Sequence, residues 1–205
     1  MKRLTLTALM LSTLVACSED EKDTDPNAAI DLARGGYQCA TMTTSMGDLV
    51  LALDERKAPK TVANFKQYMD QGFYDGLLFH RVMPNFMIQG GGFETNMEQK
   101  QPHAPIENES TNGLKNYRGR IAMARTNQPH SATSQFFINA VDNSFLNRED
   151  ARDGWGYAVF GGVISGMDVV DRIQQVETKT VDFHQNVPVQ EIFINSLQAS
   201  ECPSA

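Results

Sequence analysis

Residues 79–91 place a single arginine, Arg81, among large apolar side chains and one glutamine, Gln89. A second dense stretch covers residues 123–126 and continues at 134–139 as Ser-Gln-Phe-Phe-Ile-Asn. A guanidinium stays charged at every physiological pH and donates hydrogen bonds from a rigid planar group. Beside apolar side chains it can bind and polarise a ligand, but it supplies no nucleophile. The pattern therefore indicates binding, or a reaction without a covalent intermediate.

Other catalytic machinery is missing from the sequence. It contains no GxSxG, HExxH, P-loop or dinucleotide-binding motif, and the glycines at 90–92 are not followed by Lys-Ser/Thr. The histidines (His80, His103, His130, His184) lack metal-like spacing, and no CxxC pair suggests zinc. We therefore expect no metal and no cofactor. The net charge of −7 and the pI near 5.1 give no sign of nucleic-acid binding.

The elements that must position these residues are mainly strands. Short runs with alternating or β-branched residues are separated by Gly, Pro and Asn. We expect strands at 39–43, 49–53, 78–82, 86–89, 119–123, 136–139, 158–160 and 191–194. Two segments, 59–70 and 167–176, instead repeat their apolar residues with helical spacing. The fold class that follows is mainly β: a closed eight-stranded antiparallel barrel capped by two α-helices.

At residues 79–91 and 123–139 the sequence resembles the cyclophilin family of peptidyl-prolyl cis/trans isomerases. The segments that match the motifs of this family are FHRVMPNFMIQGG, MARTNQPHSATSQFFI and, from Trp155 to Gly161, WGYAVFG. The resemblance covers roughly residues 37–197 and is nearest to the bacterial periplasmic branch. It implies the barrel fold and an isomerase activity on proline-containing, unfolded or partly folded exported proteins, with no cofactor.

The resemblance also assigns roles to individual residues. Arg81 corresponds to the catalytic arginine, and the main chain at Ala124 and Arg125 to a strand that binds the peptide. Gln89 and Gln135 would bind the substrate or hold Arg81. The residues expected to line or rim the proline pocket are Phe86, Met87, Phe137, Phe145, Leu146 and Tyr157.

The chemistry suits these residue types. An X–Pro bond resists rotation because the nitrogen lone pair is delocalised into the carbonyl, which gives a barrier of about 18–20 kcal/mol. A guanidinium near the prolyl nitrogen can donate a hydrogen bond that is stronger in the twisted than in the planar state, as catalysis requires. An apolar pocket anchors the ring and excludes water.

Three positions depart from the family pattern. Phe145 stands where cyclosporin-sensitive members carry tryptophan, so a hydrogen bond to the drug is lost and only weak cyclosporin binding is expected. Tyr157 aligns best with the usual rim histidine, which leaves that contact undefined. Arg125 replaces a common asparagine, and its charge is expected to favour acidic substrates.

The amino terminus resembles a bacterial lipoprotein signal. Residues 1–16 combine Lys2 and Arg3 with an uncharged apolar run that is too short to span a membrane. We expect cleavage before a lipidated Cys17, followed by a flexible acidic tether at 17–36, the isomerase domain at 37–200 and a tail at 201–205. The protein would be a monomer anchored by lipid on the periplasmic side, in the outer membrane. The alternative is an ordinary cleaved signal peptide and a soluble periplasmic protein.

Two cysteines, Cys39 and Cys202, lie near opposite ends of the predicted domain. An oxidising compartment permits a disulfide between them, and two free thiols are the alternative. Two other functions remain open as well. One is a proline-binding chaperone module without catalysis. The other is a small-ligand barrel of the lipocalin kind, which the bulky strand residues argue against because they predict a filled interior.

Overall fold

The computed structural model describes Ile30, Leu32 and residues 35–203. The predicted signal peptide and the lipidated Cys17 lie outside the described residues, as does most of the tether. The chain forms β1 (Tyr37–Thr44), β2 (Gly47–Asp54), α1 (Pro59–Asp70), β3 (Arg81–Met83), β4 (Met87–Gly90), β5 (Arg120–Met123), β6 (Phe136–Asn139), β7 (Val159–Ser165), α2 (Met167–Gln174), β8 (Thr178–Val181), β9 (His184–Pro188) and β10 (Ile194–Ser200). No helix among these residues is long and apolar enough to cross a membrane.

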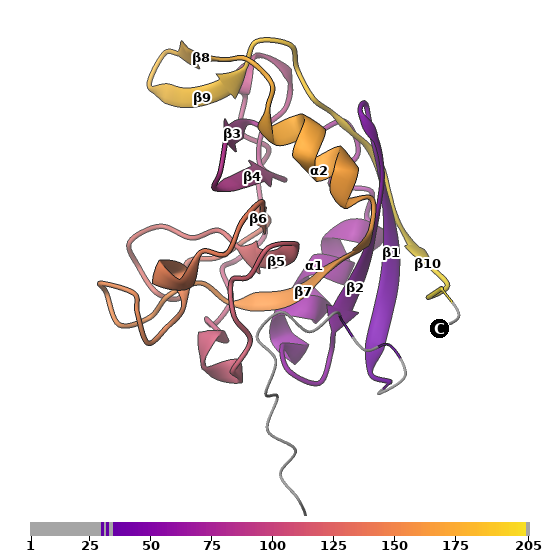
Figure 1. Ribbon diagram of the computed structural model, residues 1–205, viewed down its shortest axis with the longest axis vertical. Helices are drawn as coiled ribbons and strands as arrows, with labels where there is room; N and C mark the ends of the chain where they lie inside the picture. The colour runs from indigo at the N-terminus through magenta and orange to yellow at the C-terminus, as the bar shows by residue number, and fades with distance from the viewer. Residues whose placement is uncertain (1–29, 31, 33–34, 204–205) are drawn as a thin grey trace, which may run out of the picture.

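Eight strands form one curled antiparallel sheet in the order β10-β1-β2-β7-β5-β6-β4-β3 (Figure 1). The first two strands pair along their whole length around a turn at Ser45 and Met46. The Thr44 hydroxyl closes this turn by donating to the Gly47 carbonyl at 2.6 Å and accepting from the Met46 N–H at 3.0 Å. These two sequence neighbours lie between β10 and β7 in one half of the sheet, and the short strands β3 to β6 form the other half.

The expectation of a closed barrel is wrong, because the sheet is an open, curled half-barrel. In the part of the chain that the structure describes, no ladder joins the edge strands β3 and β10. The segments just before the two strands meet at an isolated bridge between Leu78 and Phe193, and backbone hydrogen bonds join residues 76–79 to residues 192–194. Residues 71–76 form turns, and β3 itself has only three residues.

The two helices lie on the apolar interior of the curl. Helix α1 buries Val62, Phe65 and Met69, the face that the 3.6-residue period predicts, and Pro59 begins it. Helix α2 buries Val169 and Ile173 and packs against β2, β3 and β4 (Figure 1). Each helix therefore covers a part of the sheet that would otherwise expose apolar side chains.

Large side chains fill the interior between sheet and helices. Phe65 contacts Tyr74, Phe136 and Phe160 with ring centroids 5.1–5.7 Å apart. All four of these side chains are fully buried. Such packing leaves no apolar cup for a small ligand, and this contradicts the lipocalin-like alternative.

Two strand predictions differ from the structure near the carboxyl end. We expected a strand at 191–194, whereas β10 begins at Ile194 and continues to Ser200. The β8–β9 hairpin was not predicted. Most of its side chains are polar and exposed or half-buried, and its sequence lacks the apolar alternation by which a strand is recognised.

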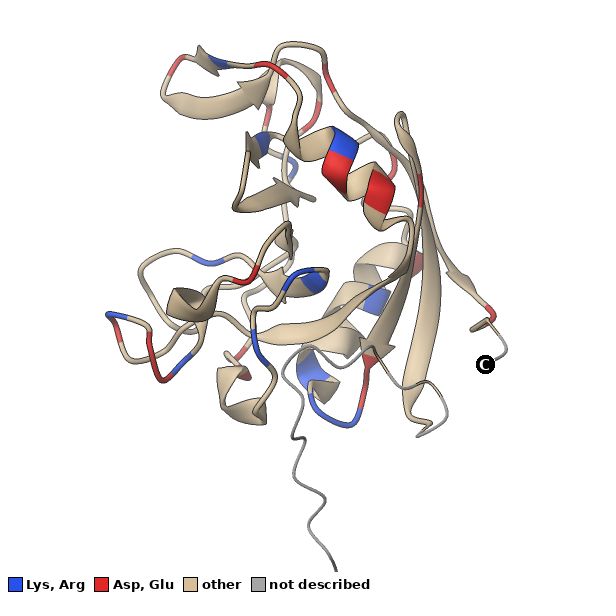
Figure 2. Cartoon of the chain, viewed as in Figure 1, with Lys and Arg blue, Asp and Glu red and all other residues tan. Residues whose placement is uncertain are grey.

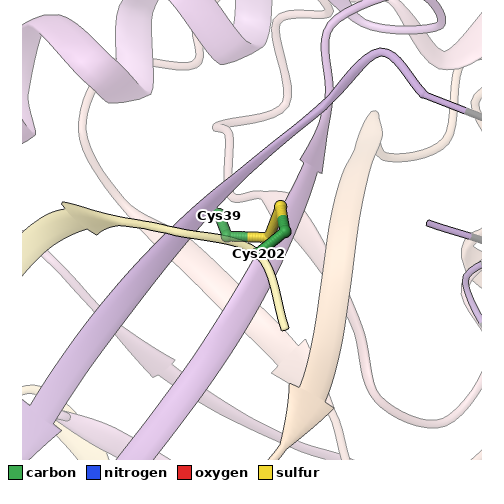
Figure 3. The surroundings of a disulfide bond; sticks show 2 residues. All are labelled: Cys39 and Cys202. Carbon is green, nitrogen blue, oxygen red and sulfur yellow. A yellow bond between two sulfur atoms is a disulfide. The ribbon is translucent and has the colours of Figure 1, made fainter. Parts of the chain in front are cut away.

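A disulfide joins Cys39 of β1 to Cys202, which follows β10 (Figure 3). Cys39 is buried and Cys202 is exposed. The bond lies where Cys39 pairs with Ser200, at the end of the β1–β10 ladder. It therefore ties the carboxyl-terminal strand to the first strand of the domain.

Candidate active site

A cleft of about 520 Å³ lies on the side of the curled sheet away from the main core. It brings together most of the residues that the sequence predicts for the site: Arg81, Phe86, Met87, Gln89, Ala124, Arg125, Gln135, Phe137, Leu146 and Tyr157. Phe145 is the predicted site residue that does not line it. Residues more than 70 positions apart in the chain thus share one surface.

Strand alternation produces the apolar part of this cleft. Successive side chains point to opposite faces of a strand, so one face can build the core and the other a pocket. Ile88 and Phe136 belong to the main core, whereas their neighbours Met87 and Phe137 belong to a second cluster. Leu146 joins that cluster, together with Ala122 and Val159. The second cluster lines the cleft and offers an apolar surface for a proline ring.

Arg81 lies beside this apolar cluster at the start of β3. It faces Gln89 in the β3–β4 register and donates from Nη1 to the Gln89 Oε1 at 3.4 Å. Its Nη2 contacts the Met83 sulfur at 3.0 Å. No carboxylate of the described residues pairs with it. Partial burial lowers the pKa of the guanidinium below its usual value, but an arginine keeps its charge. The cleft therefore holds an uncompensated positive charge.

Gln89 and Gln135 orient this guanidinium as a pair. The Gln89 side chain accepts from Arg81 and donates from Nε2 to the Gln135 Oε1 at 3.0 Å. A side chain whose donor and acceptor ends are both occupied has little freedom to rotate. The chain of three groups thus limits the directions in which Arg81 can point.

Replacing Gln89 with alanine is expected to lower kcat for an X–Pro peptide about ten-fold and to change KM little. Arg81 would lose its lateral support, and misplacing a catalytic group costs rate more than substrate affinity. Steady-state kinetics on one peptide would measure both constants. Gln128→Ala, on an exposed loop, is the matched control. A loss confined to KM would mean that Gln89 binds substrate and does not position Arg81.

Buried asparagines hold the segment that carries Leu146. Asn143 donates to the Phe86 carbonyl at 2.9 Å and to the Asn139 Oδ1 at 2.7 Å, and Asn139 donates to Asn116 at 3.3 Å. The Leu146 N–H donates to the Asn143 carbonyl at 2.9 Å. These bonds connect three loops that no local sequence pattern relates, and they place Leu146 against Phe137.

Phe145 forms an outer rim and not a cleft wall. Its ring is 56% exposed and stacks on Phe86 with centroids 5.6 Å apart. It therefore supports Phe86 from outside, while Leu146, its neighbour, turns inward.

Arg125 lies in the cleft wall with its charge compensated. Its Nε donates to the Gly156 carbonyl at 2.9 Å, it pairs with Asp153, and it lies over the Tyr157 ring at 4.6 Å. The Trp155 N–H and the Arg125 guanidinium lower the pKa of Asp153 to about 2. The pair is therefore ionised at neutral pH. Arg125 does not give the cleft the positive rim that we expected to attract acidic substrates.

The main chain beside Arg125 is partly available to a peptide. The Ala124 N–H already donates to the Gln135 carbonyl at 2.9 Å. A substrate strand added here can use the Ala124 carbonyl but not that N–H.

The structure adds residues to the cleft that sequence reasoning missed. His80 and Phe93 line it next to Arg81, and residues 183–186 of the β8–β9 hairpin overhang it. His80 stands within the arginine motif and could have been included on that ground. The hairpin lies about a hundred positions further along the chain, and no motif connects it with Arg81.

Burial holds His80 in its neutral form. The residue is 5% exposed and its Nδ1 has no hydrogen-bond partner among the described residues. Burial, helped by the nearby His184, lowers the pKa of His80 to about 3. In the unfolded chain the same ring has its ordinary pKa near 6.5.

The stability of the fold is therefore expected to fall as the pH drops from about 6.5 to 3. In that window the unfolded chain binds a proton at His80 and the native protein does not. The free energy of unfolding therefore falls by up to about 1.4 kcal/mol per pH unit. Urea unfolding of the wild type and of His80→Gln, measured at several pH values, isolates this contribution. Equal slopes in the two proteins would contradict it.

These features define a class of protein: a curled β-sheet protein with a peptide-sized cleft, in which a free guanidinium borders an apolar pocket. Among the described residues, no group of three or more His, Cys, Asp or Glu side chains could hold a metal ion. Residues 39–199 match the family model of the cyclophilin type peptidyl-prolyl cis-trans isomerase/CLD. The chain belongs to this family.

Its relatives agree on the activity. A peptidyl-prolyl cis-trans isomerase of Acinetobacter baylyi is 56% identical over 164 residues, which are 80% of this chain and 86% of that protein. Peptidyl-prolyl cis-trans isomerase B of Escherichia coli is 54% identical over 162 residues, 78% of this chain and 99% of that protein. The protein is a peptidyl-prolyl cis-trans isomerase.

Solved structures agree on the fold and on the ligand class. A cyclophilin type isomerase of Cryptosporidium parvum matches with a TM-score of 0.67 and 25% identity, over 82% of this chain and 99% of that one. The same enzyme has been solved in the presence of the dipeptide Ala-Pro; that structure also has a TM-score of 0.67 and 25% identity, over 80% of this chain and 100% of that one. The family binds proline-containing peptides.

Proposed function

We propose that the protein assists the folding of exported proteins, and that Arg81 drives the rotation of their X–Pro bonds without a covalent intermediate. The observation that carries this proposal is the state of Arg81. Its guanidinium borders the apolar cluster of Met87, Phe137 and Leu146, and no carboxylate of the described residues neutralises it.

In this mechanism the apolar cluster holds the proline ring while the bond before it rotates. As the bond twists, the nitrogen lone pair leaves the amide resonance and becomes a hydrogen-bond acceptor. Arg81 donates a hydrogen bond to that nitrogen. This hydrogen bond is stronger in the twisted state than in either planar isomer. The partly enclosed cleft strengthens the contact because little water competes for the donor.

A non-enzymatic chaperone that uses the same cleft for capture alone is the competing function. Capture needs the apolar cluster but not a free guanidinium. A protease-coupled assay on an X–Pro peptide, together with peptide binding measured by NMR titration, separates the two. We expect rate enhancement by the wild type and its loss in Arg81→Ala with binding retained. Equal rates in the two proteins would refute the Arg81 mechanism.

The proposed location is the periplasmic side of the envelope, with lipid on Cys17 anchoring the protein to the outer membrane. The apolar run before Cys17 and the polar residues after it support this. The Cys39–Cys202 disulfide supports export independently, because such bonds persist in oxidising compartments. Mass spectrometry of the mature amino terminus tests it: a diacylglyceryl cysteine is expected, and an unmodified Cys17 would leave a soluble periplasmic protein.

Weak cyclosporin binding and a monomeric state stay predictions. Phe145 offers no N–H at the rim, and its ring rests on Phe86. Nanomolar inhibition would contradict the first prediction. Figure 2 shows Lys and Arg dispersed among several elements with acidic residues between them, so no nucleic-acid partner is proposed.

A further inference from the structure

The β8–β9 hairpin forms a wall of the cleft that the proposed mechanism does not use. Residues 183–186 line the cleft on the side of His80 and Arg81. Strand β9 packs beside β3, the strand that carries Arg81 (Figure 1). The hairpin therefore stands next to the proposed catalytic group without contributing to the apolar cluster.

A row of aromatic rings runs along this wall from the interior to the surface. His80 contacts Phe93 with centroids 4.5 Å apart, Phe93 contacts His184 at 5.0 Å, and His184 contacts Phe183 at 4.1 Å. His80 is buried, whereas Phe183 is 85% exposed. The row thus ends in a ring whose inner side rests on His184 and whose remaining surface is open to solvent.

The position of Phe183 is unusual for folding alone. Val181 pairs with His184, so Asp182 and Phe183 form a two-residue turn at the tip of the hairpin. Asp182 has a φ of 51°, the left-handed conformation that such turns require of a small polar residue or glycine. A large apolar side chain at a tip gains little burial. Folding of the hairpin therefore gives no reason for a phenylalanine here.

The order of strands places Phe183 on the opposite side of Arg81 from the proline pocket. Strand β3 pairs with β4, and β4 with β6, which carry Met87 and Phe137 of the apolar cluster. The hairpin lies beyond β3. A peptide whose proline occupies the apolar cluster passes Arg81 and brings a neighbouring residue towards Phe183 and His184.

We propose that Phe183 and His184 form a subsite for an aromatic or large apolar side chain close to the substrate proline. The occupant is a residue of the substrate chain, because the wall is continuous with the cleft that holds the proline. Ring contacts are worth about two- to ten-fold in affinity beyond the area they bury. The hairpin thereby favours the isomerisation of X–Pro bonds that have such a residue nearby in the substrate chain. This inference rests on the proposed function and deepens it.

The test uses five peptides with an Ala-Pro core. In the first, two alanines precede the core and two follow it. In each of the other four, phenylalanine replaces one of these four flanking alanines. We expect the wild type to prefer at least one phenylalanine peptide in kcat/KM. Phe183→Ala should remove about three- to ten-fold of that preference and leave the all-alanine peptide unchanged. Phe183→Trp should keep the preference.

Val189→Ala is the matched control, because Val189 is exposed, follows β9 and does not line the cleft. An equal effect of Phe183→Ala on all five peptides, or no effect on any, would overturn the subsite. Should the wild type accelerate no peptide, the proposed function fails. Dissociation constants of the same peptides, from NMR titration, then test whether the subsite exists. Tighter binding of a phenylalanine peptide that is lost in Phe183→Ala supports the subsite, and the absence of such a preference refutes the subsite.

Discussion

Replacing Arg81 with alanine is expected to lower kcat/KM for an X–Pro peptide by about 100- to 1,000-fold, the usual cost of removing a donor that stabilises a transition state. The variant keeps the apolar cluster of Met87 and Phe137, so it should bind the peptide almost as the wild type does. The donor to the prolyl nitrogen would be gone, and the twisted state would lose its specific stabilisation. Protease-coupled kinetics and an NMR binding titration on one peptide measure the two effects.

Two further variants sharpen this prediction. Arg81→Lys keeps the charge but replaces the planar guanidinium with a flexible ammonium, so we expect it to restore only a small part of the rate. Arg172→Ala removes an exposed arginine of α2 that pairs with Asp168 and should keep full activity. Equal rates for Arg81→Lys and the wild type would show that charge alone suffices, without the directed hydrogen bond.

Removing the disulfide is expected to have the largest effect on stability. The Cys39–Cys202 bond closes a loop of 163 residues, and a loop of that length stabilises by about 4–5 kcal/mol in the chain-entropy model. For a domain of this size the loss lowers the melting temperature by roughly 10–20 °C. Cys202→Ser is the cleaner variant, because Cys202 is exposed whereas Cys39→Ser would bury a hydroxyl. Calorimetry and urea unfolding measure the change.

Reduction of the wild type with dithiothreitol should reproduce the loss, and Cys202→Ser should not respond to the reductant. Isomerase activity at low temperature should stay unchanged, because neither cysteine lines the cleft and the disulfide lies at the end of β10 away from the Leu78–Phe193 bridge. If the oxidised wild type and Cys202→Ser unfold at the same urea concentration, the bond does not stabilise the fold.

The sequence predicted the parts of the protein that depend on neighbouring residues. The apolar period of residues 59–70 gave the helix with its bounds, and the turn at 45–48 gave the first strand pair. The arginine motif placed Arg81, Phe86, Met87 and Gln89 together because β3 and β4 follow one another and pair directly. The resemblance to the cyclophilin family also linked residues 79–91 to Phe137, although no local pattern in the sequence shows that β4 and β6 are adjacent.

Long-range packing decided the features that the sequence left undetermined or predicted wrongly. Arg125 was expected to present its charge, but Asp153 compensates it from a loop 28 positions away. Phe145 was expected at the pocket rim and Leu146 in the lining, but only the structure shows that buried asparagines fix this segment with Leu146 turned inward. Ion pairs and hydrogen bonds of this kind depend on where loops meet in space. They cannot be predicted from the residue type at one position.

The sequence by itself determined the family and predicted that Arg81, Met87 and Phe137 lie together in one cleft, because these residues occupy short strands whose side chains alternate between core and cleft. Only the tertiary structure decided that the sheet stays open and that the β8–β9 hairpin stands beside Arg81. Strand edges and loop positions result from contacts between residues far apart in the chain. A mostly polar hairpin such as this one carries no apolar pattern by which its place could be predicted.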